Sequence, residues 1–289
     1  MKELNILVLA KQVPDTRNVG QDAMKADGTV NRGALPAIFN PEDLHALEQA
    51  LRLKDNYGAT ITLLTMGPPR AAEIIREAMY RGADKGILLT DRAFAGSDTL
   101  ATSYAISMAA KKVNPDIIIA GRQAIDGDTA QVGPQVAEKL GWPQVTYAET
   151  IEQVKDKHIR IKRRLENGIE IVNTSFPLVI TVTGSAPECR TRHAKRTIKF
   201  KHARTVSELQ SESRDYETMF QHKPWLKIQE WDVEYVDADK ALLGLSGSPT
   251  KVKKIENVVF TAKETKKIEG TTTEINELIK EMIENHTIG

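Results

Sequence analysis

Short apolar runs alternate with segments of helical spacing through the first half of this chain. The apolar runs are Leu4–Ala10, Ala59–Gly67, Lys85–Asp91 and Asp116–Gly121. The helical segments that follow them in turn are 40–56, 68–82, 97–114 and 129–141. Continuous apolar strands separated by helices are typical of a parallel sheet that helices cover on both faces. The expected fold class is therefore α/β, with a Rossmann-like, doubly wound, mostly parallel sheet.

The alternation stops after Trp142, where three strand-like segments follow one another at 145–154, 158–173 and 177–184. Asn167–Gly168 is a strong signal for a two-residue hairpin turn. We therefore expect an antiparallel hairpin, after which the strand at 177–184 returns to the main sheet.

The last third of the chain has no regular strand–helix pattern. Residues 190–204 are very basic, residues 205–239 are polar with isolated aromatics, and the final segment, TTTEINELIKEMIENH, has the spacing of an amphipathic helix. Such a sequence does not easily build its own core. We predict one α/β domain over 1–200 and an extended C-terminal arm over 201–289 that packs on a partner subunit.

Composition excludes several classes of function. The 40 basic and 39 acidic residues nearly cancel, so the basic run indicates a solvated face or a docking surface for an acidic partner in preference to a nucleic-acid site. Cys189 is the single cysteine, and no histidine pair at ligand spacing suggests a metal site. No phosphate loop or GxGxxG motif follows the first strand, which argues against a nucleotide triphosphatase and an ordinary nicotinamide dehydrogenase. No catalytic residue is identified, and we expect a cytoplasmic protein.

Ligands of doubly wound sheets bind outside the carboxyl ends of the strands. Here those ends carry small residues at Ala10, at Gly67 and at Gly121, and the loop after Gly121 leads into a helix. Asp128 and Gln131 have the spacing of a capping box, so that helix is expected to begin near Asp128. Two interpretations stay open at this point: a helix start that binds an anion such as phosphate, or a well-capped helix without a ligand.

Five segments together resemble the β subunit of electron transfer flavoproteins: VLAKQVPD, NPEDLHALEQALRLKD, GADKGILLTDRAFAGSD, PDIIIAGRQAIDGDTAQVGPQVAEKLGWPQVTY and AKR, of which the fourth is the most specific. The resemblance extends from Leu4 to about Phe200, and a weaker resemblance is found at GLSGSPTKV. It implies a fold of the adenine-nucleotide-binding type and a heterodimer with an α subunit that carries FAD. The β subunit of this family binds AMP in one class and a second FAD in the bifurcating class.

The resemblance also implies where the nucleotide binds. Asn40 and the backbone around Ala10 and Met66 would hold adenine and ribose, and the N–H groups from Gly127 to Val132 would hold phosphate. The implied cofactor-binding residues are Ala10, Asn40, Pro41, Glu42, Asp43, Met66, Gly121, Arg122, Gln123, Ala124, Ile125, Asp126, Gly127, Asp128, Thr129, Ala130, Gln131 and Val132.

AIDGDTAQVGP is similar to the class with a second FAD, which we expect in preference to AMP. That class implies NADH as donor, with one electron passing to the α-subunit FAD and the other to ferredoxin or flavodoxin. The family's Asn-Glu-Pro-Arg loop is replaced by GSAPECRTRHAKR. The partner is therefore expected among dehydrogenases, quinone reductases and iron–sulfur oxidoreductases. The alternative is a stand-alone adenine-nucleotide-binding sensor without redox activity.

Overall fold

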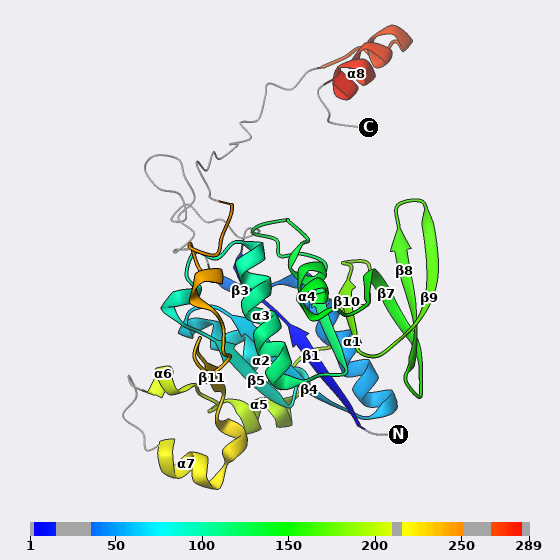
Figure 1. The fold of residues 1–289 in the computed structure, drawn as a ribbon. Helices are drawn as coiled ribbons and strands as arrows, with labels where there is room; N and C mark the ends of the chain where they lie inside the picture. Colours follow the sequence, from blue (N-terminus) through cyan, green and yellow to red (C-terminus); the bar gives the residue numbers. More distant parts are fainter. Residues whose placement is uncertain (1–2, 16–35, 210–215, 251–266, 285–289) are drawn as a thin grey trace. The chain divides into compact units, whose positions relative to one another are not determined.

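A computed structural model describes residues 3–15, 36–209, 216–250 and 267–284. Its central feature is a nine-stranded sheet in the order β11-β5-β4-β1-β6-β10-β7-β8-β9 (Figure 1). The strands of this sheet are β1 (Leu4–Leu9), β4 (Ala59–Met66), β5 (Lys85–Leu89), β6 (Ile117–Gly121), β7 (Gln144–Lys155), β8 (His158–Leu165), β9 (Gly168–Ser175), β10 (Leu178–Val182) and β11 (Gln229–Trp231).

Helices cover both faces of the parallel part of the sheet. The helices α1 (Pro41–Tyr57) and α2 (Ala72–Arg81) contribute to the apolar core on one face, whereas α3 (Thr99–Val113) and α4 (Val132–Leu140) contribute to the core on the other. In β1, Ile6 and Val8 face the first core, and Leu7 and Leu9 face the second. Burial on both faces explains why this strand is continuously apolar. The predicted α/β class with a mostly parallel sheet is confirmed.

The expected antiparallel hairpin is also confirmed. β7 pairs with β8 and β8 pairs with β9, both antiparallel. The two-residue turn between β8 and β9 is Glu166–Asn167, one residue before the predicted Asn167–Gly168, because Gly168 already pairs with Leu165 as the first residue of β9. β10 then returns to the sheet and runs parallel between β6 and β7. A second, two-stranded sheet of β2 (Gln12–Pro14) and β3 (Ala37–Phe39) was not anticipated, because its strands have only three residues each.

Residues beyond 200 contribute more to the main unit than the sequence suggested. β11 pairs with β5 at the edge of the sheet, and the compact unit extends through Lys253. The expected boundary at residue 200 therefore lies within this unit. The other elements among its described residues are α5 (Ala194–Phe200), α6 (Val206–Leu209), α7 (Tyr216–His222) and the short 3₁₀ helices η2 (Pro69–Ala71), η3 (Arg92–Phe94), η4 (Pro224–Leu226) and η5 (Lys240–Leu242).

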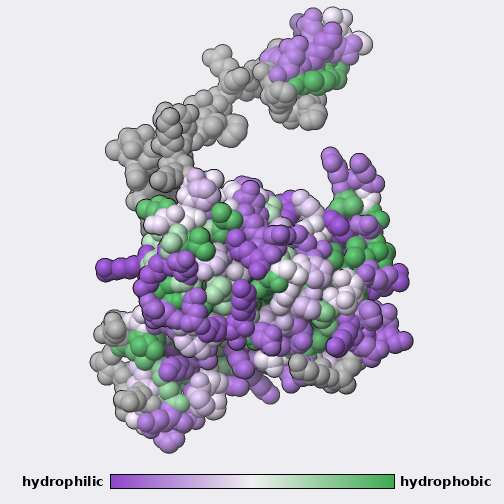
Figure 2. Space-filling model, in the orientation of Figure 1, coloured by the Kyte–Doolittle hydropathy of each residue, from purple (hydrophilic) through white to green (hydrophobic). Residues whose placement is uncertain are grey.

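The amphipathic helix expected near the C-terminus is present as α8 (Thr272–Glu284), in a second unit that begins at Lys254. Ile275, Ile279 and Ile283 are exposed, and Figure 2 shows apolar side chains gathered on one side of this helix. No helix in the described part of the chain is long and apolar enough to cross a lipid bilayer.

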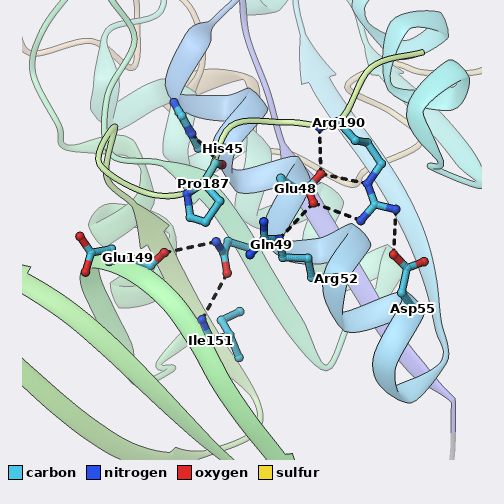
Figure 3. Close-up of polar contacts among 9 residues, drawn as sticks. All are labelled: His45, Glu48, Gln49, Arg52, Asp55, Glu149, Ile151, Pro187 and Arg190. Atoms are coloured by element: carbon cyan, nitrogen blue, oxygen red, sulfur yellow. Dashed lines mark hydrogen bonds and ion pairs between the residues drawn. The ribbon is translucent and has the colours of Figure 1, made fainter. Parts of the chain in front are cut away.

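The basic segment after β10 is held onto α1 by an ion pair between the partly exposed Arg190 and the buried Glu48 (Figure 3). Glu48 of α1 is 4% exposed, and it accepts hydrogen bonds from the backbone N–H of Arg190 at 3.1 Å and from its Nε at 3.0 Å. A second guanidinium nitrogen of Arg190 reaches Asp55 at 2.8 Å. Burial alone would raise the pKa of Glu48, but the bonds from Arg190 and Arg52 hold that pKa below its usual value.

Arg190→Met is expected to lower the free energy of unfolding by about 1–3 kcal/mol, because it leaves the buried Glu48 carboxylate with less compensation. The stabilisation by Glu48 is present above the pKa of the unfolded chain and is lost as the pH falls through the lowered pKa of the folded state. In the variant, that loss moves to higher pH. Urea unfolding between pH 3 and 7 measures both effects.

Arg192→Met is the matched control, since Arg192 pairs with Glu77 through a side chain that is 61% exposed. We expect it to cost less than about 1 kcal/mol. Equal losses in the two variants would contradict the importance of the Glu48–Arg190 pair.

Candidate functional site

A cavity of about 360 Å³ lies at the carboxyl ends of the central strands β1, β4 and β6. The chain adds β4 and β5 on one side of β1 and then crosses to place β6 on the other side, so the strand order reverses there. Such a switch point is where open α/β sheets bind ligands. The volume lies within the range of about 300–1,000 Å³ that is common for small-molecule pockets.

Asp43, in the first turn of α1, connects the ends of β1 and β6. Its carboxylate accepts the backbone N–H of Lys11 at 2.8 Å and that of Gly121 at 3.1 Å. Burial raises the pKa of Asp43 to about 7, against the opposing effect of hydrogen bonds from Lys11, Asn40 and Gly121. The carboxyl group is therefore part of the frame of the cavity and also a titratable group on its wall.

Gly121 is required for this close approach. A Cβ atom at this position would lie 2.4 Å from Oδ1 of Asp43 and 2.7 Å from the backbone carbonyl carbon of Glu42. Backbone atoms cannot give way as a flexible side chain can, so α1 packs against the end of β6 only because residue 121 has no side chain.

The start of α1 also holds the first half of the loop after β6. Asn40 is fully buried; its Nδ2 donates to the carbonyl of Gln123 at 2.8 Å, and its Oδ1 accepts the N–H of Ile125 at 3.2 Å. Glu42 pairs with Arg122 at 2.9 Å and accepts the N–H of Gln123 at 3.0 Å. Asn40 precedes the helix as expected, but its side chain makes no capping bond with α1.

The second half of the loop, Gly127–Gln131, has a strained backbone. Asp128 and Ala130 have φ values of +47° and +53°, a conformation that costs a residue with a Cβ atom about 1–2 kcal/mol. Gln131 follows in the right-handed region, at φ −100° and ψ −31°. A left-handed residue followed by a right-handed one points successive N–H groups to the same side and forms an anion-binding concavity.

The predicted capping box does not form. α4 begins at Val132, and the carboxylate of Asp128 instead accepts the side-chain amide of Gln123 at 2.8 Å. The reason is Pro134, which has no N–H to donate. It fits the first turn of a helix that starts at Val132, but in a helix starting at Asp128 it would leave the carbonyl of Ala130 without a partner.

The N-terminus of α4 is consequently left uncapped. Gln131 makes no side-chain capping bond. Within the described part of the chain, the backbone N–H groups of Thr129, Ala130, Gln131 and Val132 donate to no acceptor. Three of these residues precede the helix, and all four line the cavity. Free donors at a helix N-terminus favour a negatively charged ligand.

A second helix N-terminus at the cavity, that of α3, is already satisfied. Asp98 accepts the N–H groups of Leu100 at 2.9 Å and Ala101 at 3.0 Å, and its other oxygen accepts the hydroxyl of Thr250 at 2.6 Å. Burial would raise the pKa of Asp98, but these bonds hold it below the usual value. Thr250, in the segment of weaker family resemblance, thus contacts a residue of the cavity wall.

The structure brings most of the expected site residues together. Thirteen of them line the cavity: Ala10, Asp43, Met66, Gly121, Arg122, Gln123, Ala124, Gly127, Asp128, Thr129, Ala130, Gln131 and Val132. Five others are not on its wall: Asn40, Pro41, Glu42, Ile125 and Asp126. Sequence reasoning missed a further set on the wall: Leu9, Lys11, Leu64, Ser97, Asp98, Thr99, Thr102, Ile106, Ala120 and Gly133. The cap pattern at Asp98 was the available signal for the residues at the start of α3.

The residues present suit a nucleotide. One part of the wall is apolar, with Leu9, Leu64, Met66 and Ile106, and can pack against a planar ring. Another part carries the free N–H groups of the second half of the loop, which suit a phosphate. A Cβ atom added at Gly127 would meet no other atom within 4 Å, so the approach to these donors is open.

Comparison with known proteins agrees with the sequence resemblance. Residues 27–206 match the model of the electron transfer flavoprotein domain family. The chain is 44% identical to an electron transfer flavoprotein subunit beta of Clostridium acetobutylicum, over 96% of this chain and 94% of the relative. It is 52% identical to an acryloyl-CoA reductase electron transfer subunit gamma of Anaerotignum propionicum, over 62% and 67% respectively. It is 45% identical to the protein FixA of Azorhizobium caulinodans, over 65% and 68%.

Ala130→Gly is expected to raise the free energy of unfolding by roughly 0.5–1 kcal/mol, because glycine adopts a positive φ without the clash of a Cβ atom. Ala137→Gly, in the interior of α4, is the control and should lower it by about 1 kcal/mol. Denaturant unfolding of both variants measures the difference. A loss of stability in Ala130→Gly would contradict backbone strain at this position.

Proposed function

This chain belongs to the electron transfer flavoprotein family, and from that membership we propose that it is a β subunit that binds an adenine nucleotide in the cavity at the carboxyl ends of β1, β4 and β6. Its role is electron transfer between a donor and another redox protein. The observation that carries the proposal is the row of free backbone N–H groups from Thr129 to Val132, beside an apolar wall. The cofactor-binding residues remain those expected from the sequence, with the missed wall residues added.

FAD is the proposed occupant, and AMP is the alternative. The similarity of AIDGDTAQVGP to the class with a second FAD supports FAD, and so do relatives whose names place them with a CoA reductase and among FixA proteins. FAD would supply the redox chemistry, while this chain binds and orients it. NADH is the proposed donor, with electrons divided between a high-potential and a low-potential acceptor. The volume of the cavity is near the lower limit for small-molecule pockets, and this favours the smaller ligand, AMP.

We propose that the chain works as a heterodimer with an α subunit in the cytoplasm. Two surfaces support a partner. The apolar side of α8 exposes Ile275, Ile279 and Ile283, and the β8–β9 hairpin exposes Leu165 and Ile169 by 40% and 54%. Apolar side chains that are exposed in a row or patch mark interaction sites. The acceptor is proposed among dehydrogenases, quinone reductases, iron–sulfur oxidoreductases, ferredoxins and flavodoxins.

Purification of the full chain with its co-expressed partner, followed by extraction and identification of the bound nucleotides, tests the proposal. Two FAD per complex are expected. One FAD and one AMP would overturn the bifurcating assignment and retain nucleotide binding. A colourless, stable monomer would favour the stand-alone sensor instead.

Gly127→Glu is expected to remove the nucleotide from the β-subunit cavity and to leave the α-subunit flavin in place. The glutamate would enter the open space beside the free N–H groups and repel a phosphate, without a clash in the protein itself. Gly127→Ala is the control and should retain both nucleotides. Cofactor stoichiometry and the melting temperature of each complex are measured together. Full occupancy of both sites in Gly127→Glu would place the nucleotide elsewhere.

A further inference from the structure

The acidic side chains on the cavity wall outnumber the basic ones, which opposes the binding of an anionic ligand. Among the lining residues, the basic side chains are Lys11 and Arg122, and the acidic ones are Asp43, Asp98 and Asp128. The free N–H groups of the loop carry only partial charges. A nucleotide phosphate that binds here therefore benefits from one cation that is not already neutralised by the protein.

Arg122 is not available for that role. Its Nη2 and Nε contact the carboxylate of Glu42 at 2.9 and 3.3 Å, and the same carboxylate accepts the N–H of Gln123. The Glu42 side chain is only 13% exposed. Withdrawal of Arg122 would leave this carboxylate poorly compensated and would loosen the loop after β6.

Lys11 is the more exposed of the two cations. Its Nζ contacts the two carboxylate oxygens of Asp126 at 2.7 and 2.8 Å, and its side chain is 50% exposed, against 34% for Arg122. The Asp126 side chain is 20% exposed. An ion pair with so exposed a cation contributes little to stability, and the lysine head moves on a flexible stem. Its backbone is fixed by contrast, because its N–H donates to Asp43 and its carbonyl accepts the N–H of Asn40.

Lys11 lies on the cavity wall, whereas its partner Asp126 does not. The residue before Asp126, Ile125, is held through its N–H by Asn40. The loop therefore keeps its place when the Lys11–Asp126 contact opens. The lysine head is the part of this arrangement that is free to exchange one oxygen partner for another.

We propose that Lys11 is a phosphate-binding residue of this cavity. Without ligand, its ammonium group pairs with the carboxylate of Asp126, and a nucleotide phosphate replaces that carboxylate when it binds. This rests on the proposed nucleotide-binding function. Two consequences separate exchange from a purely structural ion pair. Loss of the lysine weakens binding of a phosphate-bearing ligand, whereas loss of the competing carboxylate strengthens it.

The test is isothermal titration of the full chain in complex with its co-purified partner, after removal of bound nucleotide, with AMP and with adenosine as the phosphate-free probe. Lys11→Met is expected to weaken AMP binding about tenfold, equivalent to about 1.4 kcal/mol, and to leave adenosine binding unchanged. Asp126→Asn is expected to tighten AMP binding several-fold, again without an effect on adenosine. The double variant should behave as Lys11→Met does.

Lys85→Met serves as the control, because Lys85 is an exposed lysine at the start of β5 and does not line this cavity. It should leave both affinities unchanged. If Lys11→Met and Asp126→Asn weaken AMP and adenosine alike, the pair is only structural and the exchange is refuted. Unchanged AMP affinity in Lys11→Met also refutes the exchange, and it leaves nucleotide binding by the cavity as proposed. FAD is titrated into the unaltered complex as well, and failure to bind FAD, AMP and adenosine alike overturns the proposed function itself.

Discussion

The cavity depends on one buried carboxylate. Asp43 accepts an N–H from the end of β1 and another from the end of β6, and so connects α1 to both strands at the point where the strand order reverses. Its burial raises its pKa to about 7. The cost of burying this group is offset because each of its two carboxylate oxygens accepts the N–H of one strand end.

Around that carboxylate the loop after β6 is divided into two parts with different roles. Its first half is bound by Asn40 and Glu42 and is part of the frame. Its second half is strained at Asp128 and Ala130, and it presents backbone N–H groups that the described part of the protein does not use. A rigid first half positions the second half, and the strain in the second half points its donors in one direction.

The fold was predictable because its signals are local. Apolar runs on strands buried on both faces, the helix start at Asn40–Pro41 and the hairpin turn just before Gly168 each follow from a few neighbouring residues. β11 was not predictable, because three residues after a polar segment become a strand only by pairing with β5. Asp128 was misinterpreted as a helix cap, because Pro134 moves the start of α4 to Val132 and the Asp128 carboxylate then accepts the amide of Gln123. The role of Asp98 was available from its cap pattern and was overlooked.

The sequence by itself determined the α/β class, the antiparallel hairpin, the stretch that surrounds the cavity and the resemblance to electron transfer flavoproteins. These depend on periodicity and on contiguous motifs. Only the tertiary structure decided how Asn40, Asp43 and Glu42 use their side chains, which helix N-terminus is left with free donors, and that Lys11 pairs with Asp126. Each of these is a contact between residues that are far apart in the chain, 115 positions for Lys11 and Asp126, and it is decided by competition among partners that folding brings together.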